Sequence, residues 1–193
     1  MSTTIEPIAA NAIPTWQIDP AHTNVEFAVK HLMIATVKGG FADVTGVLKG
    51  DLAQPGQFEL EVDLATASVD TRQEQRDAHL RSADFFDAEK WPTIRFVGKR
   101  IDGDVGADFT LYGDITIRSV TRELKLDVTN EGTARDPWGN SRVGFSAKGK
   151  LDRRDFGLVY NQALETGGFV LGDEIKLSID AEFTAVAVDA AAA

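Results

Sequence analysis

The sequence predicts an all-β domain whose antiparallel strands form a sandwich or a closed barrel. Three observations carry this prediction. Apolar and polar residues alternate in several runs, as they do in strands with one buried face. Loops rich in Gly, Asp, Asn and Pro separate these runs. No spacing between runs accommodates a repeated crossover helix, so a parallel sheet is not expected.

The strand prediction rests on period-two alternation along most of the chain. The clearest runs are residues 24–30, 58–64, 123–128, 142–151 and 174–183. Strand signals recur about eight times, and an eight-stranded barrel has room inside for side chains or one small ligand. Glycines within these patterns suit bent barrel strands and leave space along the wall: Gly46, Gly98, Gly113 and Gly149. We therefore predict an eight-stranded closed antiparallel barrel.

Turn and helix signals interrupt the strands. Residues 54–57 (QPGQ) predict a type II turn, and the loops at 102–108 and 136–142 resemble hairpin connections. One principal helix is predicted over 72–81, because Thr71 and Glu74 have the spacing of a capping box. Asp77 and Arg81, four residues apart, would pair on its surface. Short helical turns follow it.

The length, cysteine content and net charge of the chain exclude several classes of structure and binding partner. The chain has 193 residues, which suits one domain, and no cysteine, which excludes disulfides and thiolate ligands. Its formal net charge of −10 argues against binding nucleic acid and against simple docking on an anionic membrane.

The two ends of the chain have no targeting pattern. Residues 1–15 and 187–193 are predicted to be flexible tails around a domain at 16–186. No stretch reads as a secretory signal or is long and apolar enough for a transmembrane segment, so a cytoplasmic location is expected.

Several motifs together resemble the YceI-like family. They are IDPAHTNVEFAVKHL (18–32), VKGGFADVTG (37–46), SVDT (68–71), RDAHLRSADFFDAEKWPTIRF (76–96), LYGDITIRSVTREL (111–124) and RRDFGL (153–158). Their order and register extend over nearly the whole chain. The resemblance implies a lipocalin-like barrel, usually a homodimer and frequently periplasmic in this family, that holds a long isoprenoid or similar lipid chain.

Under this interpretation, aromatic and apolar residues line a cavity. Phe85 and Phe86 stand next to each other in a highly charged segment, so they either anchor it to the core or line the cavity. The candidate lining residues are Phe27, Val29, Leu32, Ile34, Phe41, Phe85, Phe86, Phe96 and Phe109. In an ordinary barrel, the same side chains would fill the core.

Polar residues near the helix are candidates for contact with a lipid head group. These are Arg76, His79 and Arg81; the alternative is that Arg72, Arg76 and Arg81 pair with Asp77, Asp84 and Asp87. His22, His31 and His79 lack the spacing of a metal site, so no metal is predicted. Each histidine is expected to bond loop backbone or a carboxylate, and no catalytic residue is assigned.

The leading hypothesis is non-enzymatic binding, storage or transport of a long-chain isoprenoid or similar apolar lipid, with no other cofactor. One alternative is an isomerase or hydrolase that acts on a lipid-like substrate with His79 or His22 as base. Another is a ligand-free stress-response module with a packed barrel.

Overall fold

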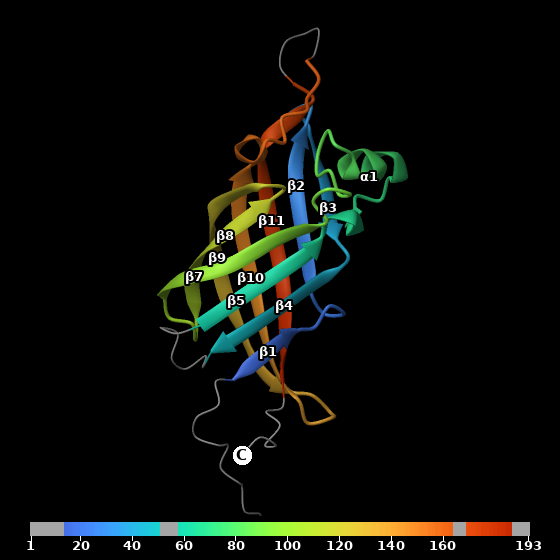
Figure 1. Cartoon of the computed structure of the whole chain (residues 1–193). Helices are drawn as coiled ribbons and strands as arrows, with labels where there is room; N and C mark the ends of the chain where they lie inside the picture. Colours follow the sequence, from blue (N-terminus) through green and yellow to red (C-terminus); the bar gives the residue numbers. More distant parts are fainter. Residues whose placement is uncertain (1–13, 51–57, 164–168, 187–193) are drawn as a thin grey trace, which may run out of the picture.

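The computed structural model describes residues 14–50, 58–163 and 169–186. In these residues one sheet of 11 strands and one α-helix, α1 (Glu74–Arg81), make up the regular structure (Figure 1). Short 3-10 turns occur at η1 (Thr66–Ser68) and η2 (Arg153–Phe156). The strands are β1 (Thr15–Ile18), β2 (Asn24–His31), β3 (Ala35–Phe41), β4 (Val44–Gly50), β5 (Phe58–Ala65), β6 (Val69–Asp70), β7 (Thr93–Gly103), β8 (Asp108–Ile117), β9 (Val120–Arg135), β10 (Ser141–Asp152) and β11 (Leu171–Ala185).

Eight of the strands close into an antiparallel barrel. Their order is β1-β4-β5-β7-β8-β9-β10-β11, and pairing of β1 with β11 completes the ring. The long strand β11 makes this possible, because its last residues pair with β1 while residues 171–180 pair with β2. Strands β3 and β6 continue from β2. The predicted eight-stranded lipocalin-like barrel with one principal helix is confirmed.

The alternation in the sequence translates directly into burial. In β9, Leu124, Leu126 and Val128 are buried, while Lys125 and Asp127 between them are exposed. Successive side chains of a strand point to opposite faces, so one face of each strand supplies the interior and the other faces water.

The helix begins differently from its prediction. Its N-cap is Gln73, whose side-chain oxygen accepts a hydrogen bond of 2.5 Å from the backbone N–H of Arg76. Thr71 instead donates its backbone N–H and its hydroxyl to the carboxylate of Asp77. Asp77 is only 6% exposed and holds the chain that leads into the helix. The predicted surface pair of Asp77 with Arg81 is therefore wrong, because Asp77 faces inward onto Thr71.

Some predictions fall on residues outside the described ranges. The predicted turn at 54–57 and the tail at 187–193 lie there, as does the first tail up to residue 13. Strand β1 already includes Thr15, at the end of that predicted tail. Among the described helices, none has the length and apolar character needed to cross a bilayer.

Candidate functional site: an apolar cavity inside the barrel

The barrel encloses a cavity of about 600 Å³. This volume lies within the range of roughly 300–1,000 Å³ that is typical of ligand sites. Part of its wall is built from inward side chains of β8–β11, namely Leu111, Ile115, Leu124, Leu126, Val128, Ala147, Leu177 and Ile179. The interior of the barrel is therefore lined by apolar side chains and leaves a cavity between them.

Most of the candidate lining residues lie on the cavity wall. They are Phe27, Val29, Phe41, Phe85, Phe86, Phe96 and Phe109. The neighbours Phe85 and Phe86 belong to separate aromatic groups. The ring of Phe86 lies 5.7 Å from that of Phe41, whereas Phe85 lies 5.3 Å from Tyr160 (centroid to centroid). Both rings thus connect the charged segment after α1 to the barrel interior.

Leu32 and Ile34 do not line the cavity, contrary to the prediction. They are 36% and 84% exposed in the turn between β2 and β3. The backbone of Leu32 and Met33 has positive φ values of 52° and 59°. This conformation reverses the chain after His31, so the apolar run leaves the wall and projects from the barrel end.

Gly98 and Gly113 also fail to border open space. A Cβ atom at Gly113 would lie 2.3 Å from Cζ of Phe96, and one at Gly98 would lie 2.8 Å from Cε2 of Phe58. The missing side chains make room for these rings, which themselves line the cavity. A leucine at either glycine would overpack the wall rather than intrude on a ligand.

Polar lining residues gather at the end of the cavity near α1. They include Arg76 and His79 of the helix and Tyr160 and Gln162 of the segment after η2. The His79 ring centroid lies 4.8 Å from that of Tyr160, and its Nε2 lies 2.9 Å from Oδ2 of Asp84. An amphiphilic ligand would find polar partners here and a mostly apolar wall along the barrel, although Thr23 and Glu26 also line the cavity.

The three candidate head-group residues differ in their placement. Arg76 borders the cavity, with its Nε and Nη2 donating to Oγ1 and the carbonyl of Thr71. His79 also borders it. Arg81 does not, because its guanidinium donates to the backbone carbonyls of Ala67 and Val69. Among the described residues, no ion pair joins Arg72, Arg76 or Arg81 to Asp77, Asp84 or Asp87, so the predicted surface pairing is wrong.

Sequence reasoning missed Arg153 and Tyr160, which also line the cavity. Arg153 is 4% exposed and donates to the carbonyls of Leu158, Tyr160 and Gly172. It also pairs with Asp173 at 3.0 Å. By holding this loop, it places Tyr160 against His79. The motif RRDFGL contains Arg153, but nothing in its spacing shows that the side chain turns inward.

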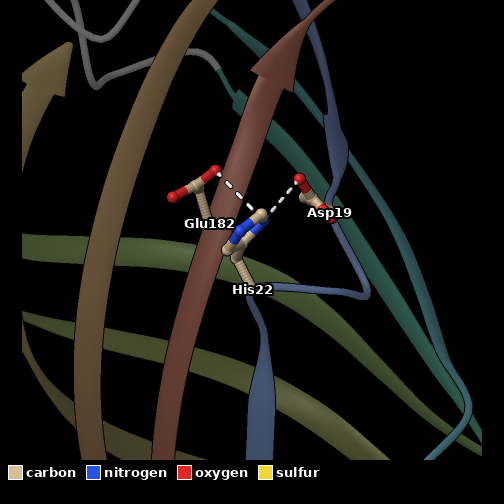
Figure 2. Close-up of side chains that lie close together, drawn as sticks. All are labelled: Asp19, His22 and Glu182. Atoms are coloured by element: carbon tan, nitrogen blue, oxygen red, sulfur yellow. Dashed lines mark hydrogen bonds and ion pairs between the residues drawn. The ribbon is translucent and has the colours of Figure 1, made fainter. Parts of the chain in front are cut away.

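The opposite end of the barrel carries an ion-pair cluster. Figure 2 shows His22 between Asp19 and Glu182, with Nδ1 at 2.9 Å from Asp19 Oδ2 and 3.8 Å from Glu182 Oε1. Nη1 of Arg142 donates to the same two carboxylate oxygens, at 2.7 Å for Asp19. The hydrogen bond from Arg142, followed by that from His22, lowers the pKa of Asp19 to about 2.

This cluster contains carboxylate and imidazole groups of the kind that bind metals, but its carboxylates already pair with the positive charge of Arg142. Potential ligand atoms of Asp19, His22 and Glu182 all lie within 4.8 Å of one another. However, the guanidinium of Arg142 already occupies the position between the carboxylates, and a divalent cation would have to displace it. We retain the prediction that the protein holds no metal for this reason.

A closed antiparallel barrel around an apolar cavity defines the chain as a lipocalin-like barrel protein. The family model for the YceI-like domain matches residues 16–183, and the chain belongs to this family. A UPF0312 protein of Staphylococcus aureus (strain MSSA476) is 36% identical over 167 residues, which cover 86% of this chain and 95% of that protein.

Solved structures show the same architecture. The YceI protein of Campylobacter jejuni is 35% identical with a TM-score of 0.68, covering 80% of this chain and 88% of that one. A polyisoprenoid-binding domain from Saccharophagus degradans has a TM-score of 0.63 at 12% identity, covering 89% of this chain and 98% of that one. The second likeness is one of fold alone.

Proposed function

We propose that the protein binds a long isoprenoid or similar apolar lipid inside the barrel, without chemical conversion, and so stores or carries it. The observation that carries the proposal is the mostly apolar cavity of about 600 Å³, with Arg76, His79, Tyr160 and Gln162 at the end near α1. The likeness in fold to a polyisoprenoid-binding domain supports the same class of ligand. The homodimer and the cytoplasmic location stay predictions.

The energetics suit such a ligand. Each methylene group removed from water contributes about 0.8 kcal/mol, so a dozen groups contribute roughly 10 kcal/mol before ordering costs. Those costs are on the order of several kcal/mol. Tight binding then requires few polar contacts, and Arg76, His79 and Tyr160 suffice to orient a polar head group.

The test is to identify the contents of the barrel and then reduce its space. We expect native mass spectrometry and an organic extract of the purified protein to show a long-chain lipid. Ala147 lines the cavity, so Ala147→Phe should lower the amount of lipid that the protein retains. Ser178→Phe is the matched control, since Ser178 is exposed on the neighbouring strand β11.

The outcomes separate the hypotheses. Loss of lipid in Ala147→Phe alone supports binding in the barrel. The proposal fails if wild-type protein contains no lipid and takes up none from a polyprenol added in detergent. Conversion of an added lipid that is abolished by His79→Ala would favour the enzyme instead.

A further inference from the structure

We propose that the α1 end of the barrel docks onto a lipid bilayer through an apolar rim, defined as Leu32, Met33, Ile34, Val159 and Phe169. The inference rests on the proposed function and names the surface from which the cavity would exchange its ligand. Figure 1 shows the β2–β3 turn, the segment before β11 and α1 at one end of the molecule.

The rim is exposed and continuous with the cavity. Met33, Ile34, Val159 and Phe169 are 59–84% exposed. Each rim segment adjoins a cavity-lining residue in the chain: Leu32 follows His31, Val159 precedes Tyr160, and Phe169 precedes Val170. The backbone N–H of Leu32 donates to the carbonyl of Val170 at 2.8 Å, which joins the turn to the Phe169 segment.

The cavity also reaches the surface at this end. Arg76 and Gln162 both border the cavity and are exposed. His79 also borders the cavity, and its side chain is 39% exposed. A ligand entering between α1 and residues 158–162 would therefore pass directly beside the rim.

The β2–β3 turn places bulky apolar residues at positions whose positive φ values disfavour them. Leu32 and Met33 occupy the two central positions, with φ of 52° and 59°, and Ile34 N–H donates back to His31 at 3.2 Å. Two positive φ values define a turn that favours Asn-Gly and opposes bulky side chains. Neither core packing nor turn preference accounts for exposed Leu-Met here, and such strain points to a functional role.

Local charge permits contact with a bilayer. The chain has 30 acidic against 20 basic residues, yet residues 30–38 contain Lys30 and Lys38 and no acidic residue. The described segments 157–163 and 169–172 contain no charged residue. Among the described residues, the acidic side chains lie outside these segments, and a neutral bilayer can approach the rim. A second copy of the chain seated here would instead cover the route into the cavity.

The test replaces the turn with the residues that its geometry prefers. Leu32→Asn combined with Met33→Gly removes two apolar side chains and relieves the strain. Wild-type protein should co-float with phosphatidylcholine vesicles, and the double variant should partition at least about tenfold less. Its melting temperature should equal or exceed that of the wild type. Trp138→Ser is the control, since Trp138 is 81% exposed in the loop between β9 and β10 at the opposite end and should not contribute.

A second variant and a second measurement complete the design. Ile34→Thr removes one rim side chain without changing the strained positions and should lower partition to a smaller extent. Filling of the cavity from polyprenol in detergent should be unchanged in both variants. If wild-type protein does not fill, the proposed function fails whatever the vesicles show.

Docking is overturned if the wild-type protein does not co-float, or if the double variant co-floats as well as the wild type. It is also overturned if light scattering shows a dimeric wild-type protein and a monomeric double variant, and the wild-type protein does not bind vesicles. In that case the rim is a contact between two copies.

Discussion

Asp19 connects the end of β1 to β10 and β11 through Arg142, and this contact makes a prediction for acid stability. The pKa of Asp19 falls from its ordinary value of 3.8 to about 2 in the folded protein. Its stabilising contribution is therefore present in full above about pH 4 and is lost as the pH falls from there to about 2. The pKa of Asp136, which pairs with the same arginine, is also lowered to about 2, so its stabilising contribution is lost over the same pH range.

The prediction is that Asp19→Asn lowers the melting temperature at pH 7 and lowers it much less at pH 2. The amide cannot make the charged contact with Arg142, so its loss matters only where the wild-type carboxylate is ionised. Thermal unfolding from pH 7 to pH 2 measures this, with Asp180→Asn on the exposed face of β11 as a control. A constant difference across this range would contradict it.

The pKa of Asp136 illustrates why such contacts escape sequence reasoning. Burial by itself raises its pKa, but hydrogen bonds from Asn140, the Trp138 backbone and Arg142 outweigh it and hold the pKa near 2. Asn140 and Trp138 are close in sequence and were within the predicted hairpin loop. The link from that loop to Asp19 spans 123 residues and exists only because β1 closes the barrel.

At the scale of elements, helix α1 is attached to the barrel by its entry loop. Its apolar face is thin, as its sequence indicates, and Asp77 is its only residue that is buried. Asp77 accepts from the backbone and hydroxyl of Thr71, and Thr71 in turn accepts from Arg76 Nε. Since burial raises its pKa but these hydrogen bonds outweigh that effect, the pKa of Asp77 is lowered.

We predict that Asp77→Ala destabilises the protein by about 1–3 kcal/mol, because buried donors of Thr71 lose their acceptor. Urea unfolding measures the loss. Amide exchange should rise in residues 71–81 more than in β8–β10, because the anchoring contact is local. The control Asp84→Ala removes an exposed carboxylate from the same region. Equal effects of the two substitutions would show that the entry loop is not the anchor.

At the scale of the whole molecule, the prediction concerns whether two copies of the chain form a homodimer. The resemblance to the YceI-like family predicts a homodimer, and the chain itself offers the apolar rim as one surface that a second copy could cover. Light scattering at micromolar concentration should show the dimer. Because we assign the rim to a bilayer, the dimer should persist in Leu32→Asn/Met33→Gly. A monomeric wild-type protein would remove the homodimer prediction and leave vesicle binding unaffected.

Much of the barrel follows from the sequence alone. Alternating runs such as 123–128 and 174–183 determine which side chains face inward, because a strand has a period of two whatever its partners are. The same rule places Phe27, Phe96 and Phe109 on the cavity wall. The family motifs add a prediction of the class of ligand, and the long charged motif contains Phe85 and Phe86, which line the cavity.

Tertiary structure decided the features that depend on contacts between distant segments. Whether the barrel is hollow depends on the distance between opposite walls, which no local pattern contains. Gly98 and Gly113 appeared to offer space, but rings from neighbouring strands occupy it. Leu32 and Ile34 matched an apolar run, but positive φ values turn them outward. Backbone carbonyls that folding brings within reach likewise set the direction of the Arg81 and Arg153 side chains.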